Sequence, residues 1–417
     1  MSYGKIVQNT PETDNIFYDI LINNVSDSQV IEAKYNAAVS TAVLENPSEY
    51  YISPQRFTIP LQEIPIFVFK DNTYVVNIRY NSVDYKTTLT YVSDSTSAQF
   101  ALQTFPANRS VYNYQQFLDS VNNGIASSFN SFAPTWSSAT TYTTGQIVSY
   151  TPTGVSKKIY VSLQNANLNN QPDSSPAFWS QIFDNAYAPY MTYEPTTELF
   201  SINASTAWYN PAFSNENQPL TLWFDTNLYS LFRAFNTLYN GTMDPDERNY
   251  QMIIRNFESN IITLTSGFSG YQMQQQFIAL YNMYDIRNIV ITTTMPIRSE
   301  YSAAFNNSSN NSMPTGSTGA TIPINTQLSN TATVKIPILT DFQLNILEGP
   351  ELLSYAQYTP TAEYRLIDMI GTIPLNNIEI TMYWQDKNYN IYPIYIPPLN
   401  SADMKLLFRR KKMYYLK

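Results

Sequence analysis

The 417-residue sequence predicts an all-β protein, a β-sandwich or jelly roll with a few short helices in its connections. Three observations support this prediction. Apolar and polar residues alternate with a period of two in many separate stretches of the chain. Tyr and Phe, which favour strands, number 34 and 22. Helical spacing of apolar residues occurs only in a few short stretches.

Two stretches show the strand pattern clearly. In residues 74–80, YVVNIRY, alternate apolar side chains share one face, NSVD follows as a turn, and the alternation resumes over residues 85–91. This pattern predicts an antiparallel hairpin. In residues 378–384, IEITMYW, apolar residues again alternate, and the turn QDKNYN leads into the extended run IYPIYIPP. Further strands are expected at residues 16–22, 56–59, 66–69, 220–224, 289–293, 334–339, 364–369 and 405–409.

Helices and one long loop are expected between the strands. Apolar residues at helical spacing predict a helix over residues 110–129 and another over 227–239, which Gly241 is placed to end. A third helical pattern covers residues 272–284. The polar stretch at residues 306–330, rich in Asn and Ser, predicts an exposed loop.

Charged residues make up only 13% of the chain, below the about 25% of an ordinary soluble domain. The surface is therefore expected to carry Asn, Ser, Thr, Gln and Tyr. Such a surface repels other copies only weakly, which suits a protein that ends inside an assembly. A coding bias toward Asn, Tyr and Ile explains the same composition. The net charge of −9 argues against nucleic-acid binding by the chain as a whole.

Two residue types are missing from the sequence. The chain has no Cys, which excludes disulfides, a thiol nucleophile and a zinc-thiolate site. It has no His, which removes the serine-protease triad and the commonest general base and metal ligand. We therefore expect no catalytic residues, no metal and no cofactor. The N-terminal residues lack a signal-peptide pattern, and no run of about 20 apolar residues predicts a membrane span.

Residues 133–150, APTWSSATTYTTGQIVSY, interrupt the strand pattern. A spaced set of aromatic, Gly, Val, Asn and Pro residues begins in this stretch and extends beyond it. Its members are Trp136, Tyr142, Gly145, Val148, Tyr150, Tyr160, Asn169, Pro172 and Trp179. Over residues 134–182 it resembles the small chitin-binding module of bacterial chitinases and phage tail proteins. Gly145 is expected in a turn with positive φ. The resemblance implies a small β-rich module that binds glycans.

Two interpretations of the module's aromatic residues remain open. About fifty residues cannot build a large core, so aromatic side chains must supply it. Alternatively, flat ring faces at the surface stack on sugars, and glycan contacts are then predicted for Trp136, Tyr142, Tyr150, Tyr160 and Trp179. Chitin-binding members carry an aromatic pair where this chain has residues 161–170, VSLQNANLNN. That departure favours the core interpretation.

The chain on either side of the module has a resemblance of its own. YRLID (364–368), the extended run that follows it to residue 398, and MKLLFRRK (404–411) resemble the closing strands of penton proteins, the vertex capsid proteins of virophages and polinton-like viruses. Residues 53–67, 220–232 and 287–301 fit the same pattern. The resemblance implies a single jelly roll that forms homopentamers at the five-fold vertices of an icosahedral capsid.

This resemblance also sets the expected organisation and partners. Residues 1–132 and 184–417 are predicted to form the jelly roll, with residues 133–183 as an outward insert. The implied partners are other copies of the chain, the neighbouring major capsid protein, and cell-surface or viral glycans. The implied location is the capsid vertex of the virion, after synthesis in the host cytoplasm.

The C-terminal end carries a basic cluster, predicted to contact packaged DNA or an acidic capsid neighbour. Its members are Arg409, Arg410, Lys411 and Lys412. A solvated terminal tail explains the same residues. DNA contact is expected only through this tail.

The sequence also allows two functions other than that of a structural capsid protein. The module also suits a phage-tail-like or surface adhesin whose main role is glycan binding. A glycoside hydrolase needs two carboxylates about 5–10 Å apart. Candidates are present, but nothing in their sequence context marks a pair: Asp225, Glu300, Asp368 and Asp386.

Overall fold

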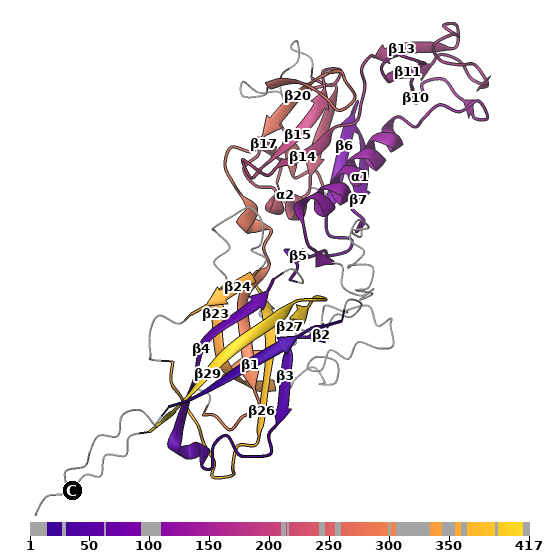
Figure 1. Ribbon diagram of the computed structural model, residues 1–417. Helices are drawn as coiled ribbons and strands as arrows, with labels where there is room; N and C mark the ends of the chain where they lie inside the picture. The colour runs from indigo at the N-terminus through magenta and orange to yellow at the C-terminus, as the bar shows by residue number, and fades with distance from the viewer. Residues whose placement is uncertain are drawn as a thin grey trace, which may run out of the picture. The chain divides into compact units, whose positions relative to one another are not determined.

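The computed structural model describes residues 15–26, 31–61, 64–92, 110–209, 214, 217–241, 247–254, 260–298, 302–305, 334–343, 355–359, 365–387 and 391–411. These residues form two compact units (Figure 1). Unit 1 contains the described residues within Met1–Ile66 and Asp285–Lys417, and unit 2 contains those within Phe67–Asp94 and Arg109–Tyr284. The predicted loop at 306–330 lies outside the described residues. Within them, no helix combines the length and the apolar character needed to cross a membrane.

The first sheet of unit 1 brings together strands from both ends of the chain. Its antiparallel strands, in spatial order, are β1 (Asn15–Asn23), β29 (Ser401–Arg410), β4 (Tyr50–Pro60) and β24 (Tyr355–Tyr358), and β25 (Ile367–Asp368) also pairs with β4. Alternate side chains of β29 are buried and form part of the core: Ala402, Met404, Leu406 and Phe408. This period of two is the one the sequence predicts for a half-buried strand.

The second sheet of unit 1 completes a sandwich. Its core order is β3 (Lys34–Ala38), β26 (Asn377–Asp386), β21 (Ile286–Thr293) and β23 (Val334–Gln343). β22 (Ser302–Phe305) extends it at β23, and β27 (Ile391–Pro393) pairs with β26. The Phe57 ring of the first sheet packs on the Phe342 ring of the second, with centroids 4.6 Å apart.

Eight described strands follow the jelly-roll order. Along the chain β1, β4, β24 and β29 belong to the first sheet, and β3, β21, β23 and β26 belong to the second. Apart from β21 and β23, which pair within the second sheet, successive strands of these eight therefore alternate between the two sheets, as in a double Greek key. The predicted single jelly roll is confirmed. Short additional pairs are β2 (Ile31–Glu32) with β28 (Tyr395–Ile396) and β5 (Phe67–Val68) with β8 (Ser110–Val111).

Unit 2 is inserted into the jelly roll between β4 and β21. The chain leaves unit 1 after Ile66 and returns at Asp285, whose backbone N–H donates to the Ile66 carbonyl at 3.1 Å. An insertion whose ends meet in this way leaves the host fold intact.

Unit 2 contains the predicted hairpin. β6 (Val75–Tyr80) and β7 (Val83–Thr88) are joined by Asn81 and Ser82, both with positive φ, as a tight two-residue turn requires. β6 also pairs with β16, and the sheet continues in the order β16 (Leu220–Phe224), β18 (Tyr250–Met252) and β17 (Thr237–Tyr239).

The helix α1 (Tyr114–Phe132) joins this sheet to a second one in the same unit. Its Phe132 ring packs on Tyr80 of β6 at 4.6 Å, and its Asn122 exchanges two hydrogen bonds with Met191 of β14. The second sheet has the order β14 (Tyr190–Glu194), β15 (Leu199–Ser205), β20 (Ser269–Gln274) and β19 (Asn260–Thr263).

The boundary between unit 1 and unit 2 differs from the predicted boundary of the insert. The prediction assigned residues 67–132 and 184–284 to the jelly roll. The structure places the described residues of these two ranges in unit 2, together with the expected insert, because α1 packs against β6, β7 and β14.

Two helix predictions were wrong at least in part. Residues 227–239 form only the short α2 (Thr226–Leu231) and then β17, because the latter pairs with β18. Of residues 272–284, the first three are the end of β20 (Ser269–Gln274), and Leu280–Asn282 form a short 3₁₀ turn. β20 is hydrogen-bonded to strands on both sides, and these pairings override local helical spacing.

The predicted small module forms two small sheets of its own within unit 2. One contains β10 (Ile147–Tyr150), β11 (Lys158–Ser162) and β13 (Trp179–Phe183), and the other pairs β9 (Thr141–Tyr142) with β12 (Asn167–Leu168). Gly145 lies in the turn between β9 and β10 with φ +87°, as the sequence predicts. The ring of Phe183 packs on Trp208 at 4.8 Å, which ties the module to the rest of unit 2.

Candidate functional site

The aromatic residues singled out in the module form one cluster. Tyr142, Val148, Tyr160 and Trp179 are buried together. The Tyr142 and Trp179 rings meet edge to face with centroids 5.1 Å apart, and the Trp179 indole N–H donates to the Asn170 carbonyl at 2.8 Å. The cluster is therefore the hydrophobic core of the module.

Burial separates the five predicted glycan-contact residues into two groups. Tyr142, Tyr160 and Trp179 are only 6%, 4% and 3% exposed, so their rings have no free face for a sugar. Trp136 and Tyr150 are partly exposed and pack edge to face on each other at 5.6 Å. Any sugar contact by the predicted set is thus restricted to these two residues.

A carboxylate lies close to the exposed pair. Burial and the negative charge of Asp173 together raise the pKa of the Tyr150 hydroxyl. Asp173 is exposed and accepts a hydrogen bond from Gln171 at 2.7 Å. A partly exposed aromatic pair with a carboxylate in its surroundings can contact a neutral sugar, whose hydroxyls donate to the carboxylate.

The basic C-terminal residues contact unit 1 itself. Arg410 ends β29 and forms an ion pair with Glu49 at 2.8 Å. Lys411 is ion-paired with Asp368, donates to the Ser48 carbonyl at 2.6 Å and lies over the Tyr51 ring. Arg409 is part of β29, and Lys412 lies outside the described residues. The structure therefore does not bear out a free tail as far as Lys411, and DNA contact stays a prediction.

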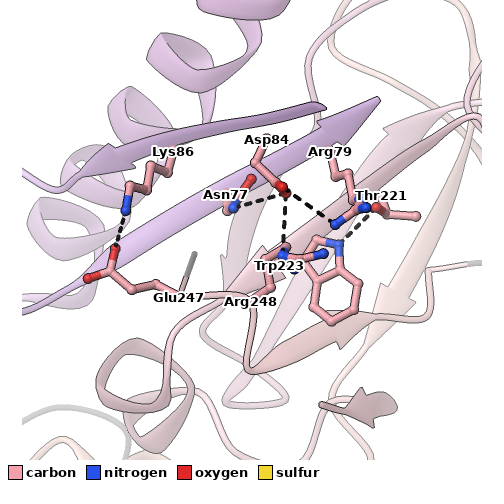
Figure 2. Close-up of polar contacts among 8 residues, drawn as sticks. All are labelled: Asn77, Arg79, Asp84, Lys86, Thr221, Trp223, Glu247 and Arg248. Atoms are coloured by element: carbon pink, nitrogen blue, oxygen red, sulfur yellow. Dashed lines mark hydrogen bonds and ion pairs between the residues drawn. The ribbon is translucent and has the colours of Figure 1, made fainter. Parts of the chain in front are cut away.

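A polar network that sequence analysis missed covers one face of the β6–β7–β16 sheet (Figure 2). Asp84 accepts a hydrogen bond from Asn77 at 3.3 Å and forms ion pairs with Arg79 at 3.4 Å and Arg248 at 3.5 Å. The Arg248 guanidinium also lies over the Trp223 ring, 6.0 Å from its centroid. The signal was present, because polar residues alternate with the apolar ones that face α1 on both strands of the hairpin.

The three described carboxylates among the hydrolase candidates have separate structural roles. Asp225 begins α2 and accepts hydrogen bonds from three backbone N–H groups. Asp386 accepts from the Tyr392 hydroxyl at 3.2 Å, and Asp368 pairs with Lys411. Glu300 lies outside the described residues. In the part of the chain that the structure describes, no group of three or more side chains is suited to hold a metal ion.

Comparison with known proteins identifies relatives along most of the chain. The family described as Sputnik minor capsid protein V18/19 matches residues 16–410. Structural protein V19 of the Sputnik virophage is 26% identical over 227 residues, which are 53% of this chain and 94% of that protein. The Sputnik protein V18, described as uncharacterized, is 28% identical over 154 residues, 31% of this chain and 91% of that protein.

Two solved structures share the fold. A chain of the cryo-EM structure of the Sputnik virophage matches with a TM-score of 0.65 at 23% identity, over 96% of this chain and 98% of that one. The crystal structure of the mavirus penton protein matches with a TM-score of 0.55 at 14% identity, over 95% and 99%. The matching family is one of minor capsid proteins, V19 is described as a structural protein, and the mavirus match is a penton protein. These relatives confirm the prediction that the chain is not an enzyme.

Proposed function

This chain belongs to the family of the Sputnik minor capsid protein V18/19, and we propose that it is the penton of an icosahedral virion. In this proposal it forms homopentamers that close the five-fold vertices and contact the neighbouring major capsid protein. The observation that carries the proposal is the eight-strand jelly roll of unit 1, combined with the family match over residues 16–410. The protein is made in the host cytoplasm and is located at the capsid vertex.

The surface chemistry of the chain supports a closed ring. A cyclic oligomer needs two different complementary patches on each copy. With charged residues at only 13%, two copies repel each other weakly when such patches meet. The outer face of β1 also exposes apolar side chains, with Phe17 57% and Leu21 59% exposed.

Native mass spectrometry of the purified full chain tests the proposal. We expect a species of five times the 47.7 kDa chain mass, and rings with five-fold symmetry by negative-stain electron microscopy. A species that stays monomeric up to high protein concentration, or rings of another symmetry, would contradict the penton assignment.

The module supports a second role, the binding of host glycans by an outward insert. Trp136 and Tyr150 carry this role, because they are the partly exposed members of the predicted set. The alternative of an adhesin whose main task is glycan binding uses the same residues. The two functions differ in assembly, since only the penton requires a pentamer.

Pull-down on chitin beads and a glycan array test the glycan role with a pair of variants. Tyr150→Ala is expected to abolish binding while the module stays folded. Thr141→Ala, an exposed residue of β9, is the control and is expected to bind normally. Wild-type protein that captures no glycan on the array would exclude the role without affecting the penton proposal.

A further inference from the structure

Unit 2 contains a surface hollow away from the module. It has a volume of about 470 Å³ and is lined by α2, the segment that follows it, β18 and the segment after β20. Tyr229, Arg233, Tyr250, Gln276 and Phe277 contribute to its walls. A hollow of this size holds one sugar ring or a molecule of similar volume.

The walls of the hollow are held together by hydrogen bonds. The buried Gln275 donates from its side chain to the Arg233 carbonyl at 2.5 Å and accepts from the Phe200 backbone at 3.0 Å. The Gln276 backbone N–H donates to the Ala234 carbonyl at 2.9 Å. These bonds join the segment after α2 to the segment after β20, so the shape of the hollow exists before any ligand binds.

Two polar side chains in the hollow have unused hydrogen-bonding capacity. Arg233 is exposed, and among the residues that the structure describes no carboxylate pairs with its guanidinium. The Gln276 side-chain amide likewise has no partner there. Most other basic side chains of the described chain differ in this respect, since Arg79, Lys86 and Arg248 in the same unit all form ion pairs.

The aromatic side chains of the hollow supply an apolar surface beside this cation. Tyr229 and Tyr250 stack on each other with centroids 3.9 Å apart. Arg233 and Tyr250 both line the hollow. Burial raises the pKa of Tyr250, the neighbouring tyrosines add to this rise, and the positive charge of Arg233 opposes it. Phe277 is 55% exposed and offers a free ring face.

We propose that this hollow binds a carboxylated sugar residue. The sugar carboxylate forms a bidentate pair with the Arg233 guanidinium, and the apolar face of the sugar ring packs on Phe277. The Gln276 amide bonds to ring hydroxyls. A single cation with aromatic surface fits one carboxylate better than the several phosphates of a nucleic acid, which bind to groups of cations. This site is independent of the penton proposal.

Isothermal titration calorimetry and saturation-transfer NMR on the full chain test the proposal. The probe is methyl β-glucuronide, and methyl β-glucoside, which differs only in its missing carboxylate, is the matched control. We expect Arg233→Gln to weaken glucuronide binding about tenfold and to leave the glucoside unaffected. Phe277→Ala is expected to weaken both sugars, because each loses the same ring contact.

Substitution of a second basic side chain tests whether unit 2 attracts anions non-specifically. Lys70 is also exposed, and Lys70→Gln removes the same charge outside the hollow. It is expected to bind the glucuronide like the wild type. Three results would overturn the proposal: no binding at millimolar glucuronide, equal binding of glucuronide and glucoside, or equal losses in the Arg233 and Lys70 variants. Near-UV circular dichroism establishes that each variant is folded.

Discussion

The Asp84 carboxylate lies 3.5 Å from the Nε atom of Arg248 and joins two parts of unit 2 that are far apart in sequence. Asp84 belongs to β7 of the hairpin, whereas Arg248 lies just before β18 (Figure 2). Side-chain exposure is 18% for Asp84 and 19% for Arg248, so the pair is largely shielded from water. Shielding makes the loss of one partner costly, because the other charge is left uncompensated.

Asp84→Asn is therefore expected to lower the free energy of unfolding of unit 2 by about 1–3 kcal/mol. The substitution keeps the side-chain shape but removes the charge that Arg79 and Arg248 share. Urea denaturation followed by circular dichroism measures the change. Glu247→Gln is the control, because its pair with Lys86 is about half exposed and is expected to contribute less than about 0.5 kcal/mol. Equal losses of unfolding free energy in the Asp84 and Glu247 variants would contradict a larger contribution from the shielded Asp84 network.

Asp225→Ala should destabilise unit 2 by about 2–4 kcal/mol. The Asp225 carboxylate accepts hydrogen bonds from the backbone N–H groups of Val75, Asn227 and Leu228, all within 3.1 Å. Without it α2 loses its N-cap and the N–H at the start of β6 loses a partner. Thermal unfolding of the full chain measures the loss, with Lys70→Ala, at an exposed position before β6, as the control. A change in Tm equal to that of the control would show that the cap is dispensable.

In the module, Trp179→Ala is expected to lower the free energy of unfolding by about 3–5 kcal/mol and to unfold the small sheets. Trp179 is buried, whereas Trp136 packs on the core from a partly exposed position. Trp136→Ala is therefore expected to cost less than half as much. Limited proteolysis within residues 133–183, compared with cleavage elsewhere, distinguishes the two variants. Loss of glycan binding in Trp179→Ala would say nothing about a sugar contact, since the module itself is lost.

Because of the Lys34–Glu379 ion pair, we expect the free energy of unfolding of unit 1 to depend slightly on pH. The hydrogen bond from Lys34, 2.8 Å away, lowers the pKa of Glu379 below its usual value of 4.5, although burial opposes this shift. A lowered pKa in the folded state stabilises the protein above about pH 4.5, and this contribution is lost as the pH falls through the folded-state pKa. The pair is partly exposed, so we expect less than about 1 kcal/mol.

Denaturation of wild type and Glu379→Gln at pH 7 and pH 3 measures this contribution. The wild type should be the more stable of the two at pH 7. The difference should be smaller at pH 3, because protonation of Glu379 removes the charge that Lys34 pairs with. A difference that stays constant between the two pH values would exclude ionisation of Glu379 as its cause.

Local patterns in the sequence were sufficient for many individual elements. Residues 220–224 form β16 as predicted, and the hairpin turns at Asn81 and Ser82 within the predicted NSVD turn. Both depend on neighbouring residues, through side-chain alternation and turn conformation. The predicted helix at 110–129 is also present, displaced to Tyr114–Phe132 by its N-cap at Asn113.

Elements that depend on distant partners were predicted less well. Residues 272–284 have helical spacing, but the first of them are paired with β15 and β19 and remain a strand. The predicted glycan contacts had the same limitation. The spacing of aromatic residues in the sequence does not show whether a ring is buried in a core or exposed at the surface. Arg233 and Gln276 could not be connected at all, since the hollow joins segments that are distant in sequence.

The sequence by itself determined that the chain is strand-rich, has neither Cys nor His, and carries a small aromatic module in a jelly-roll frame. Only the tertiary structure decided that β29 pairs with both β1 and β4, and that unit 2 enters the jelly roll between β4 and β21. It also decided that Arg410 and Lys411 pair with Glu49 and Asp368. The reason is that periodicity and turn chemistry act between neighbours along the chain, whereas pairing, burial and charge compensation depend on residues that only folding brings together.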